Sequence, residues 1–150
     1  MRLIELVDSD SKEQLAGGCI LPDGQVALAW YGKHKTHGVF PDFESFQTIQ
    51  SKIPNRLIRD YEPDNTELSL NIHIYSFHLL REKDVTGVSG TGIVAVGCDF
   101  FQAGCVLQWT GKVKSTFWYP SIAIVKEIHI HNEKTRIVIN KQNEHSFDPN

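Results

Sequence analysis

The chain has 150 residues, of which 41% are hydrophobic and 22% charged, and a formal net charge of −3. This composition is typical of a soluble globular protein of about one domain and excludes a disordered chain. A dedicated DNA-binding protein would carry a strong basic excess, so we expect no specific DNA binding.

The first half of the chain predicts short strands followed by a helix. An apolar segment at 3–7 predicts a strand, and Asp8 or Ser9 then caps a loop or brief helix. Further strands are expected at 19–21, 25–31 and 37–40, separated by the turn at 22–24 and a second turn at 32–36. Apolar residues at 43, 46, 49 and 53 share one face of a helix, which Pro54 ends.

The second half repeats this order. A charged connector is expected at 55–67 and a linking amphipathic strand at about 67–80. Strands are then expected at 91–100, 105–111 and 115–119. A helix is expected at 120–129 despite its β-branched residues, and a closing strand at 135–140. The polar tail at 141–150 is expected to fray.

Residues 18–41 and 97–120 are related by a constant offset of 79 residues. Eight of the 24 positions are identical without a gap, and these include Trp30/Trp109 and Cys19/Cys98. Each copy, about 16–58 and 85–140, is expected to be a β-β-β-α unit within one compact domain. We therefore predict an α+β fold of antiparallel sheets, in which the two copies pack as a pseudo-twofold pair and cover each other's apolar face.

The cysteines and the apolar segments indicate in which cellular compartment the protein is expected. Cys19, Cys98 and Cys105 are an odd number without a C-x-x-C pair, which argues against a disulfide framework and a cysteine zinc site. The sequence has neither a signal-peptide pattern at its start nor a run of about 18 apolar residues. We expect a reducing, cytoplasmic location without membrane association.

A glycine-rich segment, DVTGVSGTGIVAVG, opens the second copy. Its backbone N–H groups at Ser89, Gly90 and Thr91 are a candidate anion-binding loop. Its spacing matches neither the Rossmann nor the Walker pattern, and it leads into a strand where those motifs require a helix. The alternative is a tight turn or bulge that opens a strand.

Residues 84–139 resemble a group of small bacterial and bacteriophage proteins. The recurrent pattern of the group is roughly T-G-V-S-G-T-G-x-V-A-x-G, a strand ending in Trp, S-T-x-x-Y, I-H-G-H and T-x-I. The chain departs from it at IHIHNE, where Ile130 replaces the glycine. The group carries no activity to transfer, but the resemblance implies a phage or mobile-element setting, in which many small proteins bind and block host systems.

Matching basic turns follow the two tryptophans. Their lysines, with nearby hydroxyl, imidazole, aromatic and arginine side chains, are candidates for binding a phosphate and a stacked base. The set is Lys33, Lys35, His37, Lys112, Lys114, Ser115, Trp118 and Arg136. Thr116, Arg56, Arg59 and Arg81 are further candidates to assist in binding the phosphate. The alternative is that the lysines are merely solvated and the aromatic residues belong to the core or an interface.

His129 and His131 are weak candidates for a metal site. If the segment is extended they project to one face, together with Glu127, but two histidines do not complete a zinc site. The alternative is a pair of hydrogen-bonded or surface histidines. We expect no metal and no cofactor.

These patterns favour a non-enzymatic binding protein, encoded by a phage or mobile element. It would sequester an anionic nucleotide-like ligand, a host immune signal, and so counter host defence. One alternative is a protein-interaction or inhibitor module, homo-oligomeric, that binds a host protein through the strand at 115–119. The other is a His-dependent metal hydrolase or phosphodiesterase.

Overall fold

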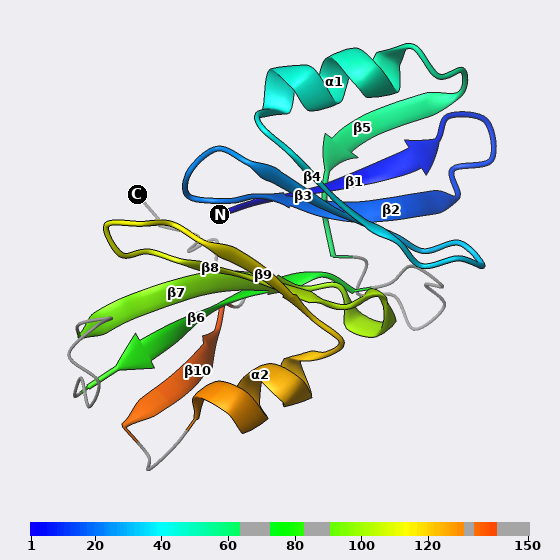
Figure 1. The fold of residues 1–150 in the computed structure, drawn as a ribbon. Coiled ribbons are helices and arrows are strands. Elements are labelled where there is room, and N and C mark those ends of the chain that lie inside the picture. The colour runs from blue at the N-terminus through cyan, green and yellow to red at the C-terminus, as the bar shows by residue number, and fades with distance from the viewer. Residues whose placement is uncertain (64–72, 83–90, 131–133, 141–150) are drawn as a thin grey trace, which may run out of the picture.

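The computed structural model describes residues 1–63, 73–82, 91–130 and 134–140, which form two five-stranded antiparallel sheets and two α-helices (Figure 1). Sheet A has the order β4-β3-β2-β1-β5 and sheet B the order β10-β6-β7-β8-β9. Sheet A is built from β1 (Arg2–Asp8), β2 (Gln14–Ile20), β3 (Val26–Trp30), β4 (His37–Phe40) and β5 (Arg56–Asp60), and α1 (Phe43–Ser51) lies between β4 and β5 in the chain. Sheet B is built from β6 (Tyr75–Arg81), β7 (Gly92–Asp99), β8 (Cys105–Trp109), β9 (Thr116–Tyr119) and β10 (Thr135–Ile139), with the short η1 (Phe101–Ala103) and α2 (Ile122–His129). The predicted α+β class is confirmed.

The structural repeat is longer than the segments 18–41 and 97–120, in which the two copies are recognisably similar in sequence. Ala16 pairs with Trp30 in sheet A as Ala95 pairs with Trp109 in sheet B, and the offset of 79 holds from β2 to the last strand of each copy. Each copy also begins with a strand, β1 or β6, so that β6 belongs to the second copy. Residues 67–72 of the predicted linking strand, residues 64–66 of the predicted connector and the tail at 141–150 lie outside the described residues.

Three local predictions were wrong. Residues 14–17, expected in a loop or brief helix, begin β2 because their backbone pairs antiparallel with β1. Residues 56–60 are β5 instead of part of a connector, because their backbone pairs antiparallel with the edge of β1. In α1 the buried side chains are Phe46 and Gln50, whereas Ile49 and Ile53 of the predicted apolar face are exposed. The two buried residues are four positions apart and therefore lie on the same face of α1. The amide of Gln50 can be buried there because its oxygen accepts a hydrogen bond from Arg56.

The molecule has four layers, with α1 and α2 outside the two sheets (Figure 1). Phe46 of α1 packs on the outer face of sheet A with Ile4, Leu6 and Leu28. Val125 of α2 packs in the same way on sheet B. Trp30 and Trp109 lie at equivalent places against these two outer clusters, as the repeat predicts. None of the helices in the described ranges is long and apolar enough to span a membrane.

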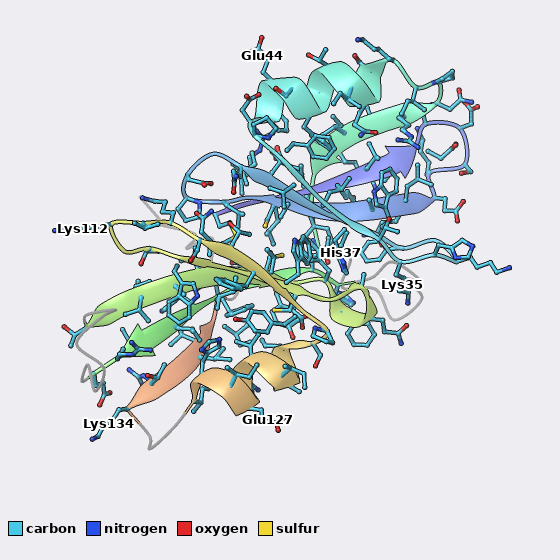
Figure 2. All side chains as sticks on the ribbon, viewed as in Figure 1. Lys35, His37, Glu44, Lys112, Glu127 and Lys134 are labelled. Atoms are coloured by element: carbon cyan, nitrogen blue, oxygen red, sulfur yellow. The ribbon has the colours of Figure 1, made fainter. Side chains whose placement is uncertain are left out.

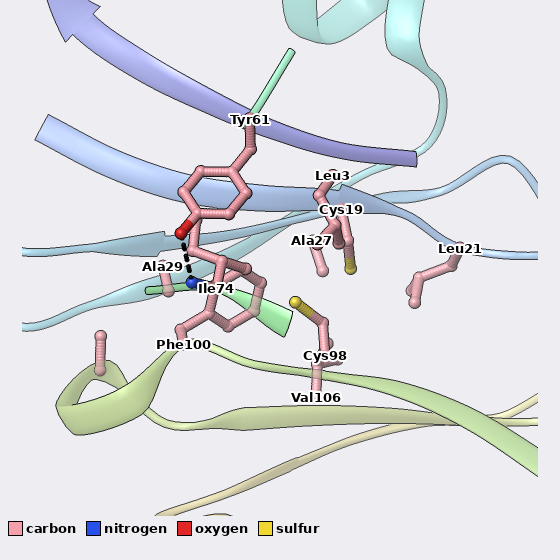
Figure 3. Close-up of a cluster of buried hydrophobic side chains, with 11 residues drawn as sticks. Leu3, Cys19, Leu21, Ala27, Ala29, Tyr61, Ile74, Cys98, Phe100 and Val106 are labelled. Atoms are coloured by element: carbon pink, nitrogen blue, oxygen red, sulfur yellow. Dashed lines mark hydrogen bonds between the residues drawn. The ribbon is translucent and has the colours of Figure 1, made fainter. Parts of the chain in front are cut away.

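The inner faces of the two sheets meet at a seam of buried apolar residues. Cys19 and Cys98, which are equivalent in the repeat, face each other there (Figure 3). Both thiols are free and buried, and burial raises the pKa of Cys98 well above its ordinary value. The Tyr61 hydroxyl accepts a 3.0 Å hydrogen bond from the Ile74 backbone N–H, next to this pair (Figure 3). Contact between equivalent residues is the arrangement expected of a pseudo-twofold pair.

Candidate ligand-binding site

A pocket of about 330 Å³ opens at one end of sheet A, between the β1–β2 loop and the β3–β4 hairpin. Its volume lies at the lower end of the range for small-molecule sites. The lining combines aromatic, amide, hydroxyl, carboxylate and imidazole groups: Glu13, Gln14, Leu15, Trp30, Tyr31, Gly32, His34 and Thr36.

Backbone hydrogen bonds fix the frame of the pocket. The Trp30 N–H donates to Thr36 O at 3.0 Å and closes the hairpin, and the Tyr31 N–H donates to Leu15 O at 3.0 Å and ties the hairpin to β2. Successive side chains of a strand point to opposite faces. Trp30 therefore packs toward α1 and Tyr31 toward the seam, so that two aromatic rings border the pocket.

A buried carboxylate orients the amide of Gln14. Gln14 Nε2 donates to Glu5 Oε2 at 3.0 Å, and Arg59 Nε donates to the other carboxylate oxygen at 2.6 Å. Glu5 is only 4% exposed, and a buried carboxylate needs such partners. The polar wall of the pocket is thus held by an ion pair in the sheet beneath it.

The hydroxyl of Tyr31 is buried at the seam and has no hydrogen-bond partner among the residues described. It lies against Gly17, where an added Cβ would collide with it and would stand 2.5 Å from Ile74 Cδ1. Burial is the main reason why the pKa of Tyr31 is raised, with smaller contributions from Cys98 and Tyr61. Gly17 is therefore needed for the ring of Tyr31 to pass between the sheets.

We expect Tyr31→Phe to stabilise the protein by about 1 kcal/mol and to raise its Tm by about 2–4 °C, because an unpaired buried hydroxyl is costly. Thermal unfolding followed by circular dichroism measures the shift. Tyr119→Phe is the matched control, since the Tyr119 hydroxyl is hydrogen-bonded to His129 Nε2 at 2.8 Å and its loss should destabilise. A lower Tm for Tyr31→Phe would contradict the expectation.

The predicted basic residues fall at two separate places. Lys33 and Lys35 are exposed in the β3–β4 hairpin, whose Gly32, His34 and Thr36 line the pocket. Lys112 and Lys114 are exposed in the β8–β9 hairpin, with Ser115 at its end. Lys35 and Lys112 lie at opposite ends of the molecule (Figure 2). The two basic turns therefore do not line one common groove.

The equivalent place in the second copy keeps the backbone frame but not the side chains. The Trp109 N–H donates to Ser115 O at 2.9 Å and the Thr110 N–H donates to Val94 O at 3.0 Å, as in the first copy. The residues equivalent to Glu13, Gln14, Tyr31 and His34 are Gly92, Ile93, Thr110 and Val113. Ile93 and Val113 are exposed, so this end presents two apolar side chains where the first copy has the amide of Gln14 and the imidazole of His34.

His37 and Trp118 come together where β4 meets the second copy. Their rings lie 4.3 Å apart, Phe100 stacks on Trp118 at 5.9 Å, and His37 Nε2 donates to Ala103 O at 2.5 Å. These contacts hold the two copies together. Arg136 is exposed in β10, at the opposite edge of sheet B from Trp118.

The candidate anion loop and the histidine pair are described only in part. Ser89 and Gly90 lie outside the described residues, and Thr91 is exposed in a bend before β7. His131 is likewise outside them, whereas His129 contacts Tyr119 and the edge of Trp109 at 5.1 Å. Within the part of the chain that the structure describes, no group of three His, Cys, Asp or Glu side chains is placed to hold a metal.

Sequence reasoning missed Glu13, Gln14 and Leu15, which lie outside the recognised repeat segment. It also treated Trp30 only as a core residue. A signal was present in the departures from the repeat, because Tyr31 and His34 replace Thr110 and Val113 between identical Trp, Gly and Lys residues.

The model of one protein family, described as the Acb5 phage protein, matches residues 14–60 and 74–141 of the chain. These two segments contain most of both copies, including β2–β5 and β7–β10. No curated protein and no solved structure matches the chain.

Proposed function

Since the chain belongs to the Acb5 phage protein family, we propose that it acts in the cytoplasm of an infected bacterium, where it binds an anionic nucleotide-like ligand and withholds this signal from the host's defence. The protein binds the ligand without converting it. This function needs a site that accepts a flat base and a phosphate at once.

The observation that carries the proposal is the pocket beside the Lys33–Lys35 turn. Trp30 and Tyr31 offer aromatic surface for a base. Lys33 and Lys35 are exposed in the hairpin, between the lining residues Gly32, His34 and Thr36, and supply positive charge for a phosphate. Base stacking on aromatic side chains and electrostatic attraction of phosphates are the two main sources of affinity for nucleotides. The volume suits one nucleoside unit.

The polar lining supports recognition of a nucleotide over other planar anions. The Glu13 carboxylate accepts hydrogen bonds from ribose hydroxyls or an exocyclic amine. His34 and Thr36 add groups that donate and accept. At the equivalent positions the second copy has Gly92 for Glu13 and Val113 for His34, so it lacks this carboxylate and imidazole, and the proposal places the ligand in the first copy.

We expect wild-type protein to bind at least one member of a panel of cyclic mononucleotides, cyclic dinucleotides and ADP-ribose in isothermal titration calorimetry. Combined Lys33→Gln and Lys35→Gln substitutions should weaken that binding about 10-fold or more, because charge-assisted hydrogen bonds to phosphate are lost. Lys112→Gln with Lys114→Gln is the matched control and should leave the affinity within about twofold.

Chromatography of the nucleotide after incubation should return it unchanged. Heat from none of the panel members would remove the proposal, and so would equal losses from the two lysine pairs. Conversion of the nucleotide would instead indicate an enzyme. Capture of a host protein at defined stoichiometry, without nucleotide binding, would favour the interaction module, whose strand β9 exposes Phe117 at the edge of sheet B.

A further inference from the structure

Arg56, the first residue of β5, is held in place beside Trp30. Its guanidinium carbon lies 4.9 Å from the centroid of the Trp30 ring, and its Nη1 donates to Gln50 Oε1 at 2.5 Å. Gln50 is only 3% exposed, so the acceptor is fixed within the core. A ring on one side and an amide at one nitrogen restrict an otherwise flexible side chain.

The positive charge of Arg56 has no carboxylate partner among the described side chains. The other two arginines of sheet A are paired: Arg2 Nε donates to Asp60 Oδ1 and Arg59 Nε to Glu5 Oε1, both at 2.6 Å. Arg56 instead contacts a neutral amide and an aromatic ring. An ordered guanidinium with donors left over is suited to bind an anion bidentately.

Arg56 and the pocket share the same end of sheet A. Arg56 pairs with Asp8 at the end of β1, and Val7 next to it pairs with Gln14 of the pocket wall. Trp30 belongs to both, because it lines the pocket and packs against the guanidinium. Trp30 therefore connects the pocket to the guanidinium of Arg56.

The second copy lacks this arrangement. The residues equivalent to Arg56 and Gln50 are Thr135 and His129, and His129 meets Trp109 edge to face at 5.1 Å. The guanidinium and the polar pocket therefore occur together in the first copy, and both are replaced in the second.

We propose that the ligand site extends from the pocket along Trp30 to Arg56, and that Arg56 binds a phosphate group of the nucleotide while Trp30 and Gln50 keep its guanidinium in position. This rests on the proposed function and deepens it. Lys33 and Lys35 attract the anion from solvent, whereas Arg56 recognises the geometry of its phosphate. The chain consequently prefers a phosphorylated nucleoside to the free nucleoside.

The test compares Arg56→Gln and Arg56→Lys with wild type in calorimetric titrations of the same nucleotide panel and of adenosine and guanosine. Arg56→Gln should weaken binding of the panel nucleotide at least 10-fold and change nucleoside binding less than twofold. Arg56→Lys should restore only part of the lost affinity, because an ammonium keeps the positive charge but not the two parallel N–H donors of the guanidinium. Arg2→Gln, which removes a paired arginine from the same sheet, should change neither.

The outcomes separate the two proposals. If wild type binds a panel nucleotide and Arg56→Gln binds it equally well, the role of Arg56 is refuted and the proposed function stands. The same holds if Arg56→Gln weakens nucleoside and nucleotide equally, which would indicate a purely structural effect. If wild type binds no panel nucleotide, the proposed function fails and the role of Arg56 fails with it.

Discussion

Gly97→Ala is expected to lower the free energy of unfolding by about 3 kcal/mol and the Tm by about 9 °C. Gly97 lies in β7 between β6 and β8, where a Cβ would stand 2.5 Å from the carbonyl oxygen of Val106 and would collide with the ring of Phe77. The carbonyl is part of the sheet ladder and the ring is fully buried, so neither can move without a loss of contacts.

The control for Gly97 is its equivalent in the first copy, Gly18. A Cβ at Gly18 would stand 3.0 Å from Ile4 Cγ1 and 3.1 Å from the carbonyl oxygen of Ala27, which is tight but leaves room for small shifts. We expect Gly18→Ala to cost about 1 kcal/mol. Urea unfolding with an unchanged m-value measures both. Equal losses at the two glycines would contradict the difference in packing described here.

The architecture could be predicted because the identical residues of the repeat include those that the packing of each sheet depends on. Gly18 and Gly97 permit close approach of a neighbouring strand, and Trp30 and Trp109 fill the same outer cluster in each copy. Such positions tolerate few substitutions, so their identity survives in both copies. Together with turn signals they predict antiparallel sheets and a paired arrangement.

The outer strands of each copy were harder to predict. In β5 and β10 only Ile58 and Ile137 are identical, and in β1 and β6 only Leu6 and Leu79. Arg56–Asp60 is an edge strand with charged, mostly exposed side chains. Its sequence therefore has no clear alternation of apolar and polar residues and looks like a solvent-exposed connector. Its pairing with β1 is a long-range contact that no local pattern encodes.

Only part of the candidate site could be predicted from the sequence, because its residues differ between the two copies. The lysines that occur in both copies made both hairpins candidates. Residues that are identical in the two copies, however, indicate what the shared fold accepts and not what is specific to a site in one copy. The pocket depends on residues in which the copies differ, such as Tyr31 against Thr110 and Arg56 against Thr135. Glu13 and Gln14 reach the hairpin only because β2 pairs with β3, which becomes visible in three dimensions.

Phe100→Ala should have the largest effect on stability, a loss of about 4 kcal/mol, because a fully buried aromatic side chain leaves a cavity that the sheets cannot close. Phe100 lies in the seam (Figure 3). It stacks on Trp118 and approaches Gly17, so it contacts groups from both copies. Its truncation removes packing that no other element replaces. Denaturant unfolding, with refolding to establish reversibility, measures the loss.

The adjacent residue is the control. Phe101 is 57% exposed and has a φ of 59°, a left-handed conformation that is unfavourable for a bulky side chain. Phe101→Gly should therefore leave the stability within about 1 kcal/mol of wild type or raise it, since glycine adopts this conformation without strain. If Phe100→Ala and Phe101→Gly destabilised the protein equally, the seam would not be the part of the core that holds the two copies together. A large loss at Phe100 alone would show that cohesion of the two copies depends on the packing in the seam.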